Sequence, residues 1–148
     1  MPEQFDPLKL ENQLCFPLYV CSKEVIRRYK PFLDPLDLTY TQYITLMVLW
    51  EHRHIAVKEL GERLYLDSGT MTPVLKKLES KGYITRTRSK EDERNVFVDL
   101  TERGLAIKDE ARGIPQHMGG CVHLTMEERQ QLHGLLVKIL KGLEHDKG

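Results

Sequence analysis

The sequence predicts a mainly helical domain with one small β-hairpin. Apolar residues recur at helical spacing near both ends of the 148-residue chain, which indicates amphipathic helices there. Two short runs rich in β-branched and aromatic residues, 83–88 and 95–100, flank a charged turn and predict two paired strands. Ahead of these strands, a tight turn joins two short helices. This order is typical of a winged helix-turn-helix, in which a hairpin follows a helical pair.

The first predicted helix covers residues 8–29. Its apolar stripe has intervals of four, three and four residues and consists of Leu14, Leu18, Cys21 and Val25. We therefore expect Cys21 to pack in a core. Pro17 interrupts the pattern, so either the helix restarts there or the missing N–H kinks it. Pro31 and Pro35 mark the turn that follows.

The second predicted helix, 40–51, should be the buried centre of the domain. Thr39 is its N-cap, because a threonine side chain accepts hydrogen bonds from free N–H groups in the first turn. Apolar residues lie on most sides of the helix, so it should pack against several neighbours. A short amphipathic helix over 57–64 follows it. The turn 65–69 then leads into the next helix.

That next helix is predicted over 70–81, with Asp67 or Ser68 as its cap. Four apolar residues at helical spacing should face the core: Met71, Val74, Leu75 and Leu78. Gly82 is the expected left-handed C-cap. The two strands come next.

The C-terminal third is predicted to be helical with a loose middle. Thr101 caps a helix that runs to about residue 112, and glycines and prolines loosen 113–120. Thr125 lies three residues ahead of Glu128, the spacing of a capping box. This box should open a last helix through Leu143.

A locally basic stretch points to nucleic acid. The formal net charge is zero, yet from Ser68 to Lys90 six basic residues accompany one acidic residue, Glu79. Because salt screens charges beyond about 8 to 10 Å, this local excess matters more than the total. Small polar residues at 68–72 also suit a helix end that enters a major groove about 12 Å wide. The stretch therefore predicts DNA binding.

The predicted DNA-binding residues fall into two groups. The helix supplies Ser68, Thr70, Thr72, Lys76 and Lys77, and the hairpin supplies Arg86, Arg88, Asp92 and Arg94. Hydroxyl groups would meet bases or phosphates, and the lysines would meet phosphates one turn later. Arg94 at the hairpin tip would enter the minor groove while Asp92 orients its guanidinium. The alternative is that 68–72 only cap a helix and the charged residues form a solvated face.

Composition limits the other function classes. No apolar run reaches the roughly 20 residues of a membrane helix, and no secretory signal is visible, so we expect a cytoplasmic protein without membrane contact. The three cysteines and six histidines lack the spacing of metal ligands. Glycine-rich phosphate loops and paired catalytic carboxylates are absent. We therefore expect no metal, no cofactor and no enzymatic activity.

The stretch from Leu60 to Gly104 resembles the winged helix-turn-helix of MarR-family transcriptional regulators, notably in Asp-Glu-Arg94 followed by VDLTERG. The segments LENQLCFPLYVCSKE, RRYKP and LTYTQYITLMVLWE resemble the OhrR group of that family, which senses organic hydroperoxides and includes staphylococcal thiol-based regulators. The resemblance weakens after about Lys108.

The resemblance implies a single MarR-type domain over 1–148. Within it, 1–35 and 104–148 supply dimerisation helices, and 36–103 forms the winged helix-turn-helix lobe. A helical homodimer of this kind binds a palindromic operator in double-stranded DNA. The resemblance also implies repression of a peroxide-resistance gene that ends when organic hydroperoxide oxidises a cysteine.

Cys15 is the predicted redox sensor. Only the thiolate form of a cysteine attacks peroxides, and hydroxyl groups that donate hydrogen bonds to it favour that form. Tyr19 lies one helical turn after Cys15, and Glu11 lies one turn before it. The resemblance adds Tyr29 and Tyr40 as hydrogen-bonding partners of the Cys15 thiolate. The alternative is an inert buried thiol.

Cys121 is the predicted resolving cysteine. It follows Gly119 and Gly120, whose backbone freedom should leave it exposed, and its location matches the second cysteine of some OhrR-like proteins. The hypothesis is that Cys15 becomes a sulfenic acid and Cys121 of the partner subunit attacks it. The disulfide requires Cα atoms within about 7 Å, which would re-space the recognition helices and release DNA. A small cellular thiol could cap Cys15 instead.

Two other functions fit parts of the sequence. In one, a small phenolic ligand in the cleft of the dimer controls a MarR-type repressor, and the cysteines are incidental. In the other, the chain is a thiol peroxidase, although nothing else catalytic accompanies the cysteine. Loss of operator binding by a Cys15→Ser protein after peroxide would favour the first of these two. Peroxide turnover with excess reductant would favour the second.

Overall fold

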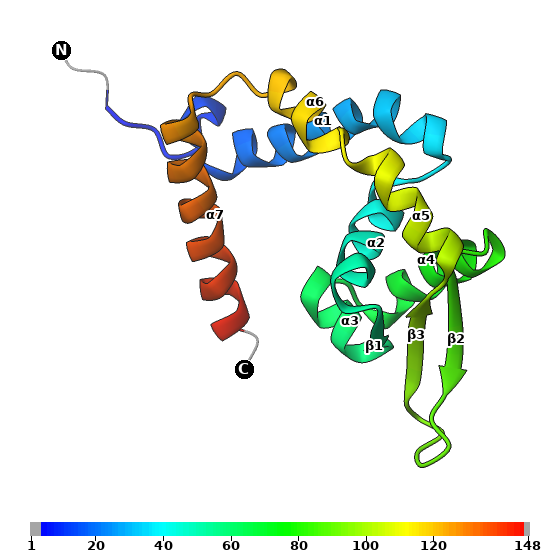
Figure 1. The fold of residues 1–148 in the computed structure, drawn as a ribbon. Coiled ribbons are helices and arrows are strands. Elements are labelled where there is room, and N and C mark those ends of the chain that lie inside the picture. Colours follow the sequence, from blue (N-terminus) through cyan, green and yellow to red (C-terminus); the bar gives the residue numbers. More distant parts are fainter. Residues whose placement is uncertain (1–3, 147–148) are drawn as a thin grey trace. The chain divides into compact units, whose positions relative to one another are not determined.

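A computed structural model describes residues 4–146, in two compact units that meet between Ile114 and Pro115 (Figure 1). The first unit contains η1 (Leu10–Asn12), α1 (Cys15–Leu33), η2 (Asp34–Leu36), α2 (Tyr40–His52), β1 (His54–Ala56), α3 (Val57–Leu64), α4 (Ser68–Ser80), β2 (Ile84–Arg88), β3 (Val96–Leu100) and α5 (Glu102–Ala111). α6 (Ile114–Cys121) begins at the junction, and α7 (Met126–His145) follows it. The predicted fold class, mainly α with a small hairpin, is confirmed.

α1 differs from its prediction at both ends. It begins at Cys15, which makes Pro17 its third residue, a position where the missing N–H has no intrahelical partner to lose. The helix therefore restarts just before Pro17. Pro31 does not end it, and the chain leaves the helical path after Leu33, through Asp37 with a left-handed φ of 54°.

The expected core position of Cys21 is wrong for the single chain. Cys21 is exposed, and so are its stripe neighbours Leu14, Leu18 and Val25. The periodicity located one face of α1 correctly. That face has no covering element within the first unit.

α2 is the buried centre, as predicted. The Thr39 side chain accepts the Gln42 N–H at 3.2 Å, and the Gln42 side chain accepts the Thr39 N–H at 3.1 Å, which completes a capping box. Leu46 and Leu49 on this helix are fully buried. The Trp50 Nε1–H donates to the Gly104 carbonyl at 2.9 Å and so joins α2 to α5.

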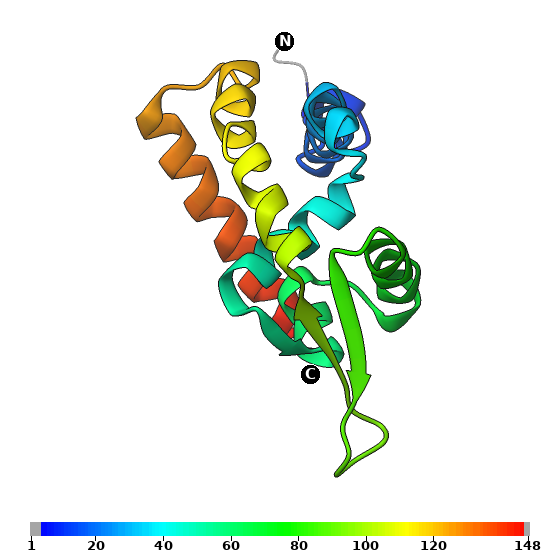
Figure 2. The same ribbon diagram turned by 45° about the vertical axis from the view of Figure 1, so that its right-hand side comes forward.

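The strands form a three-stranded antiparallel sheet of order β1-β3-β2. Its strand β2 contacts α4. The hairpin β2–β3 extends beyond the helices (Figure 2). β1 was not predicted, because three residues are too few to show an alternating pattern. Its register pairs Ile55 with Val98, both buried. At Gly104 a Cβ atom would lie 2.2 Å from the Tyr83 carbonyl oxygen, so only glycine allows α5 to start so close to the sheet.

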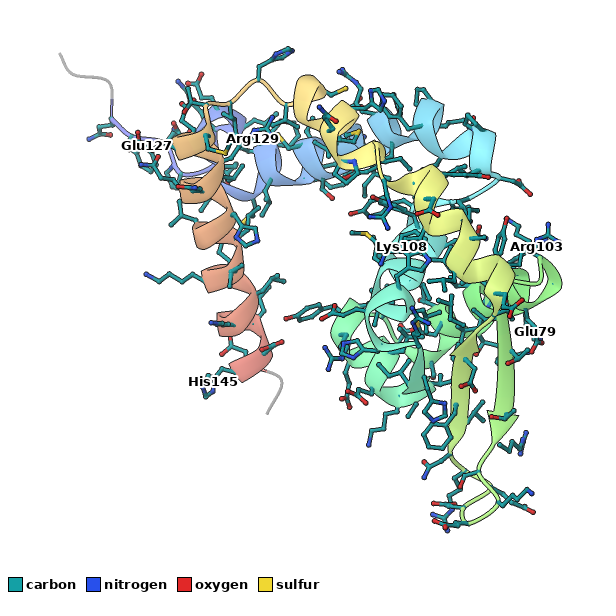
Figure 3. The ribbon with its side chains drawn as sticks, viewed as in Figure 1. Glu79, Arg103, Lys108, Glu127, Arg129 and His145 are labelled. Atoms are coloured by element: carbon teal, nitrogen blue, oxygen red, sulfur yellow. The ribbon has the colours of Figure 1, made fainter. Side chains whose placement is uncertain are left out.

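The second unit corrects one prediction and confirms another. The loose segment expected over 113–120 is helix α6. Arg129 holds its end, because the guanidinium donates to the carbonyls of Gly119 and Val122 (Figure 3). Thr125 and Glu128 form the predicted capping box, and hydrogen bonds from Thr125 lower the pKa of Glu128. Within residues 4–146, no helix is both long and apolar enough to span a membrane.

Candidate functional site

α4 presents a defined polar face. All four predicted core residues of this helix are buried, which fixes its rotation. Asp67 is the N-cap and accepts the Thr70 N–H at 2.7 Å. That backbone hydrogen bond lowers the pKa of Asp67, so the carboxylate is ionised at neutral pH. Its negative charge lies at the positive end of the helix dipole.

The predicted contacts on α4 are all exposed and come from one helix: Ser68, Thr70, Thr72, Lys76 and Lys77. Thr72 lies on the outer side, and its hydroxyl donates to the Ser68 carbonyl at 2.8 Å. The helix start therefore offers small side chains, and the two lysines add positive charge in the next turn.

The hairpin tip is organised by Ser89 and Asp92. The Ser89 hydroxyl oxygen accepts the N–H groups of Glu91 and Asp92, at 3.2 and 3.3 Å. The Asp92 carboxylate accepts the backbone N–H of Arg94 at 3.1 Å. This differs from the prediction that Asp92 orients the Arg94 guanidinium. Asp92 shapes the turn that exposes the Arg94 side chain.

Arg86 and Arg88 have different surroundings. Arg88 is exposed on β2. Arg86 is mostly covered, and its guanidinium lies 3.0 Å from the Glu79 carboxylate on α4, beside β2 (Figure 3). The hydrogen bond from Arg86 lowers the pKa of Glu79. The sequence grouped Arg86 with free cations, whereas the structure ties it to α4 and so fixes α4 against the hairpin.

Cys15 is exposed as the first residue of α1. Tyr19 follows one turn later, as predicted, with Lys23 Nζ 5.1 Å from the centre of its ring. Glu11 belongs to the separate turn η1 and not to the same helix.

The two other predicted tyrosines meet where α1 leads into α2. The Tyr29 and Tyr40 ring centres are 4.9 Å apart, and Tyr43 lies within 5.9 and 6.3 Å of them. Burial raises the pKa of Tyr29 and of Tyr40, so both phenols keep their protons at neutral pH and can donate. Fourteen residues of α1 separate Tyr29 from Cys15, which corresponds to about 21 Å along the helix. The Tyr29–Tyr40 pair therefore does not reach Cys15 of the same chain.

Cys121 ends helix α6 instead of lying in an exposed loop. It is half-buried, and its thiol contacts the His117 carbonyl oxygen at 3.6 Å. The helix continues through Gly119 and Gly120 because Arg129 binds the carbonyls near its end. Cys121 belongs to the second unit and Cys15 to the first.

Sequence reasoning missed two polar links. Lys81 Nζ, at the end of α4, lies 3.1 Å from Gln42 Oε1 and also donates to the Asp37 carbonyl. His54 Nδ1 on β1 lies 2.6 Å from Asp99 Oδ1 on β3. Neither pair has a periodic signal, because each joins segments about 40 residues apart. Among residues 4–146, no group of three or more metal-binding side chains is close enough to hold a metal ion.

Comparisons with known proteins decide the family. The family model described as "Transcriptional regulator SarA/Rot" matches residues 27–111. The "Organic hydroperoxide resistance transcriptional regulator" of Bacillus subtilis strain 168 is 50% identical over 147 residues, 99% of each chain. The chain belongs to the SarA/Rot-type regulators of the MarR family. It is a transcriptional regulator, and its family members are not enzymes.

Solved structures agree with this family. "Structure of reduced AbfR bound to DNA" matches with a TM-score of 0.79 and 29% identity over 94% of this chain and 95% of that one. "Structure of Disulfide formed AbfR" matches with a TM-score of 0.61 and 30% identity over 92% and 90%. The winged-helix fold expected of a MarR-family regulator is confirmed.

Proposed function

We propose that this regulator binds a palindromic operator as a homodimer in the cytoplasm and releases it when an organic hydroperoxide oxidises Cys15. The observation that carries the proposal is an exposed cysteine at the first position of α1, in a chain whose α4 and hairpin form a winged DNA-binding lobe. The related AbfR has been solved bound to DNA when reduced and also in a disulfide form. Repression is the regulatory direction we propose.

Uncovered apolar faces support the homodimer. Leu14, the residue before α1, and Leu18 on α1 are exposed, and α7 exposes Leu135 and Leu143. Exposed apolar faces of helices are typical of sites that another protein surface covers, and in this proposal a second copy of the chain supplies that surface. We assign dimerisation to residues 1–35 and 104–148 and DNA binding to 36–103.

The surface of the lobe suits DNA. In this proposal α4 enters the major groove with Ser68, Thr70 and Thr72, while Lys76 and Lys77 contact phosphates. Arg94 at the hairpin tip enters the neighbouring minor groove. Arg88 adds a phosphate contact, and Arg86 acts by holding α4. Two lobes related by a twofold axis would contact half-sites about 34 Å apart.

The chemical step takes place at the Cys15 sulfur. The thiolate attacks the terminal oxygen of the hydroperoxide, the O–O bond breaks, and the other oxygen leaves as an alkoxide that takes a proton from water to become an alcohol. The sulfur gives up the two electrons that reduce the peroxide and becomes a sulfenic acid.

Tyr29 and Tyr40 would stabilise the thiolate across the dimer. Since the pair lies too far from Cys15 of its own chain, we assign it to Cys15 of the partner subunit. Both phenols are protonated donors. Tyr19, on the same helix face as Cys15, is the donor within the chain.

Cys121 of the partner subunit is the proposed resolving thiol. Its sulfur attacks the sulfenic sulfur, a disulfide forms, and the hydroxyl leaves as water. Half-burial of Cys121 means that its end of α6 has to open for this step. Non-reducing electrophoresis after cumene hydroperoxide tests the pairing. A Cys121→Ser protein that still forms the covalent dimer would exclude Cys121.

An operator gel shift tests the function as a whole. Reduced wild-type protein should bind a DNA sequence enriched by selection from a random pool, lose it with cumene hydroperoxide and regain it with dithiothreitol. Cys15→Ser should bind equally well and keep its DNA after peroxide. Release by the Cys15→Ser protein would contradict the redox mechanism and favour a small ligand as effector.

A further inference from the structure

The outer side of α4 consists of small and weakly polar groups over its first two turns. Met71, Val74, Leu75 and Leu78 bury one side of the helix. At 100° per residue the opposite side carries Gly69, Thr72, Pro73 and Lys76, all exposed. This side faces a DNA groove if α4 is the recognition helix of the proposed function, on which the inference rests.

The Thr72 hydroxyl donates its proton inside the protein. Thr72 donates to the Ser68 carbonyl, four residues earlier, at 2.8 Å. Thr70 donates its backbone N–H to the Asp67 carboxylate at 2.7 Å. Gly69 and Pro73 have no side-chain donor. Of the six side chains from 68 to 73, all of which the structure describes, Ser68 and Thr70 are left with a hydroxyl donor for DNA.

A helix start of this kind has few groups for the usual polar readout. Arginine, lysine, asparagine and glutamine recognise guanine or adenine through paired hydrogen bonds, and none of these occurs at 68–73. The alternative feature in the major groove is the C5 methyl group of thymine, which is recognised by carbon. Because Thr72 Oγ1 turns back to the helix, its methyl group is directed away from the Ser68 carbonyl.

We propose that α4 selects thymine by packing the Thr72 methyl group and the Pro73 ring against thymine C5 methyl groups in each half-site. Lys76 lies one turn beyond Thr72 and is exposed, so it can hold the helix to a phosphate without selecting a base. Sequence preference and charge attraction then come from different residues of one helix.

Replacing thymine by deoxyuridine tests the inference, because the change removes only the methyl group. The DNA is the operator enriched from a random pool by the reduced wild-type dimer, and each thymine is replaced in turn. Affinity should fall about fourfold at one or two positions per half-site, as expected for one buried methyl group. Other positions should be unaffected.

Two variants distinguish the contribution of the Thr72 methyl group to DNA affinity from that of its hydroxyl group. Thr72→Val keeps the branched carbon side chain, so it should retain affinity and the sensitivity to deoxyuridine. Thr72→Ser keeps the hydroxyl, so it should lose about fourfold in affinity and no longer distinguish thymine from deoxyuridine at the contacted position. Thr85→Ser, the same change at an exposed position of β2, should behave as wild type.

Two results would overturn the inference while leaving the proposed function standing. One is full affinity for DNA with deoxyuridine at every thymine. The other is loss of binding by Thr72→Val with retention by Thr72→Ser, which would assign the contact to the hydroxyl. If the reduced protein enriches no sequence at all, the proposed function fails and this inference fails with it.

Discussion

Lys81 Nζ lies 3.1 Å from Oε1 of Gln42, a link between the end of α4 and the first turn of α2. The Lys81 side chain is 20% exposed and also approaches the Asp37 carboxylate at 3.6 Å. Gln42 is buried and belongs to the capping box next to Tyr40. One ammonium group therefore joins the end of α4 to the helix that begins with Tyr40.

Replacing Lys81 by Met should destabilise the fold. Met keeps most of the side-chain volume but has no ammonium group. The Gln42 side-chain oxygen and the Asp37 carbonyl oxygen therefore lose the donor that Lys81 supplies. We expect a loss of about 1 to 3 kcal/mol in the free energy of unfolding, measured by urea denaturation. Lys77→Met, an exposed position on the same helix, is the matched control. Equal stability of the two variants would mean that the Lys81 link contributes nothing.

The fold could be predicted where local patterns determine it. The threonine caps at 39, 101 and 125 and the glycine at 82 were each located from sequence, and each has the expected geometry. Such caps depend on residues within one helical turn. The buried face of α4 was also predicted from a local pattern, the helical spacing of its apolar residues.

Features that depend on distant groups could not be predicted. Glycines favour a loop at 113–120, but the Arg129 guanidinium ten residues away binds the carbonyls that a helix end leaves free. Cys21 was expected in a core because it lies in the apolar stripe of α1. Such a stripe identifies the apolar face of a helix, but it does not show whether another element covers that face. Arg86 counted as a free cation until the fold brought Glu79 to it. For Arg86 and for the end of α6, the deciding partner lies seven and ten residues away, beyond the span of one helical turn.

The hairpin and α4 should respond differently to charge removal. Arg94→Ala should weaken operator binding by about 1 to 3 kcal/mol, because it removes a groove contact at the hairpin tip. Lys76→Ala should weaken binding to any sequence and reduce the slope of log affinity against log salt by about one unit. Fluorescence anisotropy over a salt series measures both. Unchanged affinity in both variants would contradict the assigned DNA-binding surface.

The Arg86–Glu79 pair should make stability depend on pH in the acid range. Hydrogen bonding by Arg86 lowers the pKa of Glu79 below its ordinary value of 4.5. A carboxyl whose pKa falls on folding adds stability above its unfolded pKa, and that stability is lost as the pH drops through the folded pKa. Wild type should therefore exceed Glu79→Gln in urea midpoint at pH 7, and the difference should shrink below about pH 4.5. A difference that is constant from pH 7 to pH 3 would exclude ionisation of Glu79 as its source.

Removing the phenol hydroxyls should slow oxidation without affecting DNA binding. Tyr29→Phe and Tyr40→Phe keep the rings that pack at 4.9 Å, so the folded lobe and reduced operator affinity should be unchanged. In the proposed dimer, each variant loses one donor to the thiolate of the partner subunit. A hydrogen bond to a charged group contributes roughly 1.5 kcal/mol, so the rate of sulfenic acid formation should fall about tenfold. Trapping with dimedone at fixed peroxide measures this rate. Tyr65→Phe, at an exposed tyrosine between α3 and α4, should react as fast as wild type, and an equally slow Tyr65→Phe would show that the effect does not come from the Tyr29–Tyr40 pair.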